Sequence, residues 1–98
     1  MAILVVFQSQ DLTQELYAES VRRLTEGRKD RFESAADWPV EGLLVHVAGE
    51  GERGFRVVDV WDSEEAFRRF GEILVPILNE LGVDERPEVD AVHAFVSA

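Results

Sequence analysis

Cysteine is absent from this 98-residue chain, which excludes disulfide bonds, thiolate zinc sites and a cysteine nucleophile together. Long hydrophobic runs are absent as well. The longest, Ala2 to Phe7, is far shorter than the ~20 apolar residues that a membrane-spanning helix needs. No positively charged segment typical of a secretory signal precedes that run. These features predict a soluble, cytoplasmic protein with no membrane partner.

Basic residues are scarce: 10 lysines and arginines stand against 20 aspartates and glutamates, and the formal net charge is −10. Such a chain repels phosphate backbones and anionic bilayers. Its densest basic stretch, Gly27 to Arg31, is interrupted by an aspartate and too short for a nucleic-acid footprint, so nucleic acid is not an expected partner. The length and the apolar fraction of 46% predict one globular domain over residues 1–98.

The first part of the chain predicts a strand followed by a helix. The run Ile3 to Phe7 is apolar and rich in β-branched residues, which is typical of a strand. Asp11 and Gln14 stand at capping-box spacing, and apolar residues then recur at helical spacing as far as Gly27, a plausible C′ residue. Residues 28–41 show no clean period, so we expect a long connection that contains at most a short helical turn.

Three further strands are expected in the remainder. The runs 42–48 and 55–61 are separated by a glycine-rich hexapeptide, the pattern of an antiparallel hairpin. Residues 89–96 are again rich in valine and alanine and predict the last strand.

A second helix is predicted between the hairpin and the last strand. Asp62 and Glu65 stand at capping-box spacing, an apolar stripe follows, and Gly82 ends it. Pro76 lies within this stripe, where it removes a backbone donor, so we expect a kink or break near Val75.

The order strand, helix, strand, strand, helix, strand predicts an α+β fold of the ferredoxin-like βαββαβ type. Its four-stranded antiparallel sheet is expected in the order 4-1-3-2, with both helices on one face. The other face of such a sheet is usually polar, but these strands are apolar on both sides. An uncovered face would exceed the few hundred Å² of apolar surface that monomers tolerate. A second copy of the same sheet is the simplest cover, which predicts a homodimer.

Three stretches carry a resemblance to a known family: Gly42 to His46, the strand-to-helix junction Val57 to Phe67, and Pro76 within the second helix. In this element order the chain resembles the dimeric α+β barrel superfamily, in particular its small antibiotic-biosynthesis-monooxygenase-like members. The resemblance spans nearly the whole chain. It implies a cavity between the sheet and the helices of each protomer, and a monooxygenase-like or isomerase-like activity on a small aromatic or apolar molecule without a cofactor.

Polar residues interrupt the otherwise aliphatic strands at His46, Asp59 and His93. Burying each without a partner would cost about 1–3 kcal/mol, so we expect them to meet water, an arginine or a ligand. The resemblance implies that they line the pocket together with Trp61, and that His46 or Asp59 abstracts a proton. His46 is the better candidate because imidazole titrates close to neutral pH.

Other roles are open to two of these residues. Trp61 could pack under the second helix instead of lining a pocket. Asp59 could form an ion pair with one of three arginines, namely Arg56, Arg68 or Arg69.

Aromatic residues of the helices and of the long connection complete the predicted pocket. Tyr17, Phe67 and Phe70 belong to helical apolar stripes, which are core by default but would also line a cavity under the helices. Trp38 lies in the long connection and is expected to act as a lid over the cavity or as an anchor against the partner protomer.

Two other patterns predict no site. The stretch Gly49 to Gly54 matches G-x-G-x-x-G, but it lies between two strands and opens no helix, so a nucleotide is not expected there. His46 and His93 would lie on the two edges of the sheet, ~14 Å apart, which is too far for one metal ion. We therefore expect no metal and no cofactor.

The predicted enzymatic activity stands against one alternative function. Monooxygenase pockets of the resembled family commonly place a polar residue on the same strand face as the junction tryptophan, and here that position is Val57. This departure weakens the oxygenase hypothesis. The alternative is a non-catalytic homodimer that binds a small ligand or serves as an interaction module.

Overall fold

The computed structural model describes residues 1–84 and 86–98 of the chain. Its strands form one antiparallel sheet in the order β2-β3-β1-β4, so the predicted α+β, ferredoxin-like order 4-1-3-2 is confirmed. The elements in chain order are β1 (Ile3–Ser9), α1 (Gln14–Leu24), the single 3-10 turn η1 (Ala35–Asp37), β2 (Leu43–Gly51), β3 (Gly54–Trp61), α2 (Glu64–Glu80) and β4 (Glu88–Ala91).

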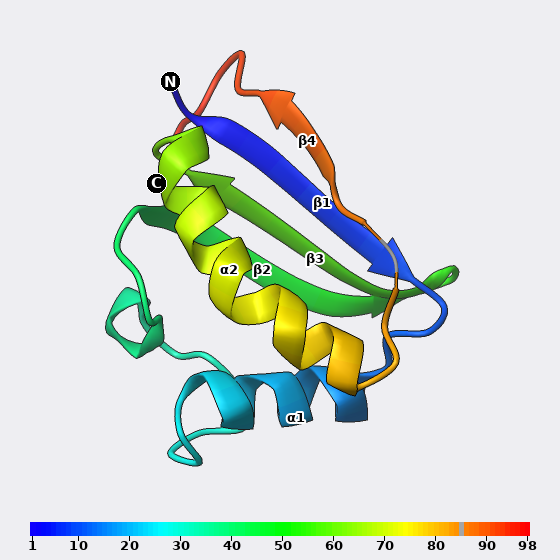
Figure 1. Cartoon of the computed structure of the whole chain (residues 1–98). Helices are drawn as coiled ribbons and strands as arrows, with labels where there is room; N and C mark the ends of the chain where they lie inside the picture. Colours follow the sequence, from blue (N-terminus) through cyan, green and yellow to red (C-terminus); the bar gives the residue numbers. More distant parts are fainter. Residues whose placement is uncertain (85) are drawn as a thin grey trace.

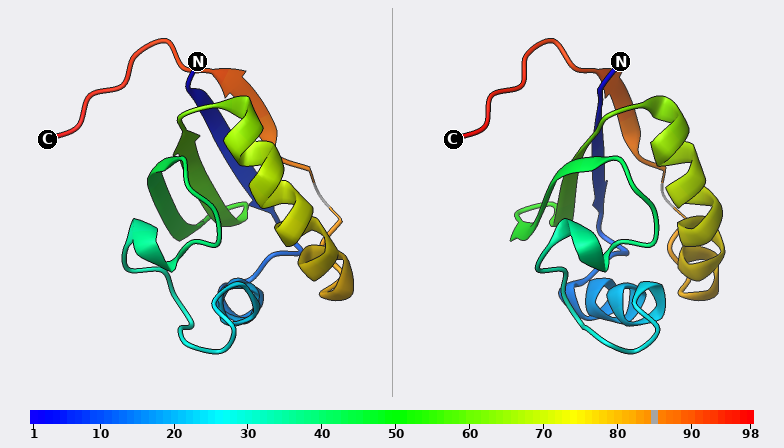
Figure 2. Two further views of the ribbon diagram at one scale, coloured as in Figure 1. Left: turned by 60° about the vertical axis from the view of Figure 1, so that its left-hand side comes forward. Right: turned by 90° about the vertical axis from the view of Figure 1, so that its left-hand side faces the viewer.

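The helices share one side of the sheet. α2 runs along this face, and α1 packs beneath α2 at the end of the sheet where β1 finishes (Figure 1). The connection between α1 and β2, which contains η1, lies on the other side of α2 from β4 (Figures 1 and 2). None of the described helices is long and apolar enough to cross a membrane.

The core lies between α2 and the sheet. Its largest buried side chain is Trp61, which packs with Val5, Leu24 and Phe70 in one cluster. A smaller cluster around Phe55 joins the beginning of α1 to the end of α2. Full burial of a large apolar side chain stabilises the fold by roughly 1.5–3 kcal/mol, so these clusters hold the helices to the sheet.

Hydroxyl residues cap both helices. Thr13 is the N-cap of α1 and accepts a hydrogen bond of 3.1 Å from the Leu16 amide. Ser63 is the N-cap of α2 and accepts one of 3.1 Å from the Ala66 amide. The N-caps predicted at Asp11 and Asp62 are therefore wrong. In each case a hydroxyl residue closer to the helix accepts the hydrogen bond from a free backbone N–H group.

A residue in the left-handed backbone conformation follows the end of each helix. After α1, Glu26 (φ 55°) is the C′ residue and the Gly27 amide donates to the Arg22 carbonyl at 2.7 Å, so the predicted C′ glycine lies one position further on. After α2, Gly82 (φ 79°) occupies the predicted position.

Pro76 does not interrupt α2, which is a single helix over Glu64–Glu80. The break expected near Val75 is therefore wrong. Pro76 removes the hydrogen bond to the Glu72 carbonyl, but both residues are exposed, so water can hydrate that carbonyl.

The last strand is shorter than the predicted 89–96. β4 is an edge strand whose only neighbour among the described residues is β1, and their ladder ends where Ile3 faces Ala91. One more hydrogen bond, from the Val92 amide to the Ala2 carbonyl, closes it. The following residues have no strand to pair with, and they run away from the sheet on the side opposite α2 (Figure 2).

A bulge in β2 changes which side chains face the helices. Leu43 lies opposite Trp61 and Val45 opposite Val60, so Leu44 is an extra residue. Strict alternation along β2 would put Leu43 and His46 on opposite faces. The bulge turns both toward the helices.

No described helix covers the opposite face of the sheet (Figure 1), whose apolar side chains range from buried Val60 to exposed Val47. Leu4 and Val6 of β1 lie opposite Val60 and Val58 of β3, respectively, in this face. At the β2 edge, Leu44 and Val47 have exposed fractions of 48% and 58%.

A substitution at Gly42 tests how tightly the start of β2 packs against α2. Its φ is 113°, and a Cβ there would lie 2.5 Å from the Ala66 Cβ. We expect Gly42→Ala to lower the free energy of unfolding by about 2–5 kcal/mol, from left-handed strain plus overpacking. Gly27→Ala is the matched control, because φ is 84° there but a Cβ meets nothing within 4 Å. Urea denaturation measures both, and equal losses would contradict the predicted crowding.

Candidate functional site

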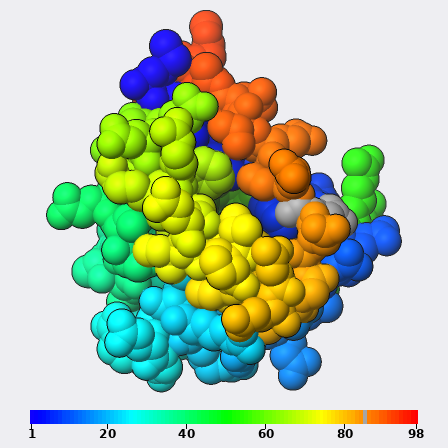
Figure 3. All heavy atoms as spheres, in the orientation of Figure 1, coloured from blue at the N-terminus to red at the C-terminus, as the bar shows by residue number. Residues whose placement is uncertain are grey.

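A cleft of about 1040 Å³ lies between α2 and the sheet. Val5 and Phe7 form part of its floor, and aromatic residues of α2 and of the connection form its walls. In the space-filling view, the surface is hollowed between α2 and β4 (Figure 3). The cleft has the size and the apolar lining of a small-molecule site.

Three polar side chains meet in this apolar cleft and form a continuous hydrogen-bonded chain. Asp59 of β3 and His46 of β2 lie directly opposite each other in the β2–β3 ladder, and Asp59 Oδ1 is 2.6 Å from His46 Nδ1. On the other side of the imidazole ring, His46 Nε2 is 2.6 Å from the Tyr17 hydroxyl of α1. The side chains of His46 and Asp59 are only 12% and 7% exposed. We call these three residues the relay.

The acceptor at one end determines the direction of every hydrogen bond in the relay. A carboxylate only accepts, so His46 Nδ1 carries the proton and donates to Asp59. In the neutral imidazole Nε2 is then an acceptor, and the Tyr17 hydroxyl donates to it. The lone pairs of the Tyr17 oxygen are left for a molecule in the cleft.

Burial holds Tyr17 in its neutral form. Removal of its ring from water, with a smaller contribution from the negative charge of Asp59, raises the pKa of Tyr17 to about 12. Free phenolate is therefore scarce near neutral pH. Tyr17 can take up a proton only as it passes its own proton to His46.

Aromatic rings from the connection and from α2 enclose His46. Phe32 and Trp38 stack on each other with centroids 4.1 Å apart, and Trp38 meets the His46 ring edge-on at 4.8 Å. Trp38 also contacts Phe70 at 4.9 Å. Trp38 thus forms part of the cleft wall, against the core.

A buried carboxylate holds the connection that carries Trp38. Asp37 accepts hydrogen bonds from the amides of Glu33 (3.0 Å) and Ser34 (3.2 Å) and from Lys29 Nζ (3.2 Å). These hydrogen bonds hold the pKa of Asp37 below its usual value, and the one from the Glu33 amide contributes most. The ordered turn therefore fixes the position of Trp38, the next residue.

The structure brings most of the predicted site residues together. His46, Asp59, Tyr17, Trp38, Phe67 and Phe70 all line the cleft. Asp59 pairs with His46, and no arginine reaches it in the described residues.

Two predicted pocket residues lie elsewhere. Trp61 is fully buried in the core behind the cleft wall, and no acceptor among the described residues reaches its indole Nε1. His93 is exposed in the segment beyond β4, at the opposite sheet edge from β2. The early end of β4 leaves His93 outside the sheet.

Sequence reasoning missed two features of the site. Phe32 lines the cleft, and the only signal for it was an aromatic residue within a polar, aperiodic connection. Tyr17 was expected as part of the wall, whereas its hydroxyl is the end of the relay. Helical periodicity gave no signal for that role, because the partner of Tyr17 is 29 positions away.

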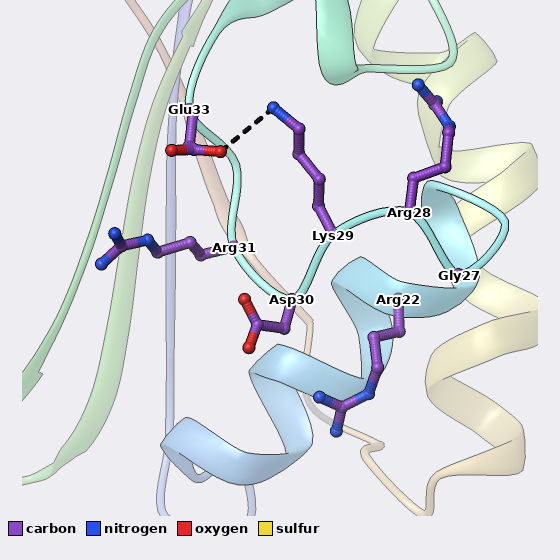
Figure 4. A pocket seen from close by; sticks show the side chains of 7 residues that line it. All are labelled: Arg22, Gly27, Arg28, Lys29, Asp30, Arg31 and Glu33. Atoms are coloured by element: carbon purple, nitrogen blue, oxygen red, sulfur yellow. Dashed lines mark ion pairs between the residues drawn. The ribbon is translucent and has the colours of Figure 1, made fainter.

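The remaining polar clusters offer no comparable site. No group of three metal-binding side chains is gathered within the described ranges. A second hollow, of about 520 Å³, lies after α1 around residues 27–33. Its charges are of both signs: Lys29 pairs with Glu33, while Arg22, Arg28 and Arg31 point away from one another (Figure 4).

No protein-family model matches the chain, and no curated protein matches it significantly in sequence. The fold therefore rests on the structure, and the resemblance to the dimeric α+β barrel superfamily stays a prediction. The chemistry of the cleft is the basis for any functional conclusion.

The single tyrosine makes the state of the relay measurable. Tyr17 is the only phenol in the chain, so its ultraviolet absorbance reports on this hydroxyl alone. We expect the phenolate to appear with a midpoint at about pH 12, and near the ordinary value of ~10 in denaturant. Because the folded pKa is the higher one, this group's contribution to stability is complete below pH ~10 and is lost as the pH rises toward 12.

Asp59→Asn is the variant that tests the charge contribution. It should lower the Tyr17 midpoint but leave it above 10, because burial is the larger cause. A midpoint in the folded wild-type protein equal to that in denaturant would contradict the buried relay.

Proposed function

We propose that this protein is an enzyme that transfers a proton at the hydroxyl or enol group of a small, largely apolar or aromatic molecule. The observation that carries the proposal is the hydrogen-bonded chain Tyr17–His46–Asp59, whose tyrosine end opens on an aromatic cleft. A perturbed titratable group at such a place is typical of catalytic sites.

The proposed step moves one proton along the relay. The substrate hydroxyl donates to the Tyr17 oxygen, and its proton passes to Tyr17 as the Tyr17 proton passes to His46 Nε2. The substrate O–H bond breaks and its electron pair stays on oxygen, as phenolate or enolate. The imidazolium that forms lies beside the Asp59 carboxylate, at 2.6 Å, which stabilises its charge.

This step serves two reaction classes. In an isomerase-like reaction the enolate carbon takes back the proton through the relay, so an enol becomes a ketone with no redox change. In a monooxygenase-like reaction, which the family resemblance implies, the same carbanion adds dioxygen as second substrate. The peroxide that forms takes up a proton and breaks its O–O bond, so that the carbon is oxidised to a carbonyl and the other oxygen atom leaves as water. We favour the isomerase-like reaction because it needs only the proton transfer that the relay provides.

A binding module is the second candidate. Both nitrogens of His46 are already satisfied within the protein, so the relay is complete without a ligand. Such a closed network also suits a protein that binds a hydroxyl-bearing molecule at Tyr17 and releases it unchanged.

Tyr17→Phe and His46→Gln test the relay. A thermal-shift screen with phenols, quinones, haem and fatty acids identifies ligands, and benzoylacetone serves as an enol probe whose ketonisation is followed by absorbance. We expect both variants to lower the catalysed rate by about 10²–10⁴-fold, the usual contribution of a general acid–base group. His46→Gln keeps a hydrogen-bonding side chain but cannot accept the proton.

Ile73→Val is the matched control, because it changes a side chain of α2 outside the cleft and should leave the catalysed rate unchanged. If the wild-type protein is stabilised by ligands but accelerates no proton transfer, the binding module is correct and the enzyme proposal is wrong.

We further propose that the protein acts as a homodimer that packs through the uncovered sheet face. Support comes from the row of apolar side chains there, which includes Val6, Val47 and Val58. The segment 92–98 also leaves the protomer on that side (Figure 2) and carries exposed Phe95 and Val96. Together they form an apolar surface that water disfavours.

Val6→Asp tests the dimer. A charge in the middle of the proposed interface should dissociate the dimer or unfold the protein, because the isolated protomer exposes this face. Sedimentation equilibrium should report two copies of the wild-type chain. Ile73→Asp adds the same charge on the exposed side of α2 and should leave the dimer intact. A stable wild-type monomer at micromolar concentration would refute the proposal.

A further inference from the structure

The cleft is much larger than the relay needs. A cavity of about 150 Å³ already holds one benzene ring, whereas this cleft measures about 1040 Å³. Its lining extends from Tyr17 of α1 and Trp38 of the connection to Val83 and Pro87, which lie between α2 and β4 in the chain. Figure 1 shows the connection and β4 on opposite sides of α2. The cleft therefore passes beneath α2.

A glycine widens the cleft at its middle. Gly71 lies in the interior of α2 and lines the cleft, and a Cβ placed on it would meet no atom within 4 Å. Glycine is less stable than alanine inside a helix, and Gly71 shows no positive φ to require it. Neither the backbone nor the packing of the protein thus explains this residue.

An exposed apolar side chain follows on the same flank of α2. Val75, one turn after Gly71, also lines the cleft and is 51% exposed. Further along this flank, the polar residues Asn79 and Asp84 mark the end toward β4. The path from Tyr17 past Gly71 to Val75 is therefore open, and its lining is mainly apolar, with Arg68 and Glu72 of α2 beside it.

We infer that the ligand carries an apolar chain that runs beneath α2, with its hydroxyl at Tyr17 and its chain along Gly71 and Val75. Gly71 determines the specificity for chain length, because any side chain there would narrow the path. This inference rests on the proposed function, since it takes the Tyr17 oxygen as the point where the hydroxyl binds.

The experiment measures affinity by calorimetry for phenol and for para-alkylphenols with chains of increasing length. In the wild-type protein each added methylene should raise the affinity about fourfold, the value for burial of one CH₂ group, until the chain reaches solvent. Gly71→Leu should bind phenol as the wild type does but lose the gain for the longer chains, by tenfold or more at para-octylphenol. Ile73→Phe adds bulk on α2 outside the cleft and should keep the full gain.

Alkylbenzenes, which lack the hydroxyl, separate the two proposals. If they show the same gain with length and Gly71→Leu removes it, while Tyr17→Phe leaves para-octylphenol binding unchanged, the chain site is supported and hydroxyl binding at Tyr17 is refuted. If affinity does not rise with chain length in the wild-type protein, or if Gly71→Leu retains the rise, the inference is wrong.

Discussion

The hydrogen bond between His46 and Asp59 is the interaction on which the site depends. A carboxylate buried in a sheet is costly unless a donor meets it, and here the donor comes from the directly opposite residue of the neighbouring strand. This pairing exists because the bulge at Leu44 turns His46 toward the helices. Once His46 Nδ1 donates to Asp59, the other ring nitrogen is an acceptor, and a donor such as the Tyr17 hydroxyl is required in turn.

The polar relay can persist in an apolar core because the surrounding segments shield it without filling the space beside it. The connection before β2 is held by the Asp37 carboxylate and brings Phe32 and Trp38 against His46. α2 covers the cleft from above, and Gly71 leaves its middle open. The site therefore combines fixed polar atoms with unfilled apolar volume, the arrangement that orients a small molecule by its polar group.

The two faces of the sheet are coupled through β3. Its residues alternate, so Asp59 faces the helices while Val58 and Val60, its neighbours in the chain, face the other way. A partner packed on the open face would therefore touch the strand that carries the relay. The strong negative charge of the chain opposes association of two copies, so apolar burial would have to exceed this repulsion in the proposed dimer.

The sequence by itself determined the element order and the strand order, because hydrophobic period and glycine positions are local signals that the ferredoxin-like connection rules convert into one topology. It also singled out His46 and Asp59, since polar residues within aliphatic strands need partners. Only the tertiary structure decided that they are each other's partners and that Tyr17 completes the relay. That pairing depends on a one-residue bulge and on where α1 lies, and neither leaves a periodic signal. The extent of β4 was likewise decided by the length of its neighbour β1, a non-local constraint that residues 89–96 do not reveal.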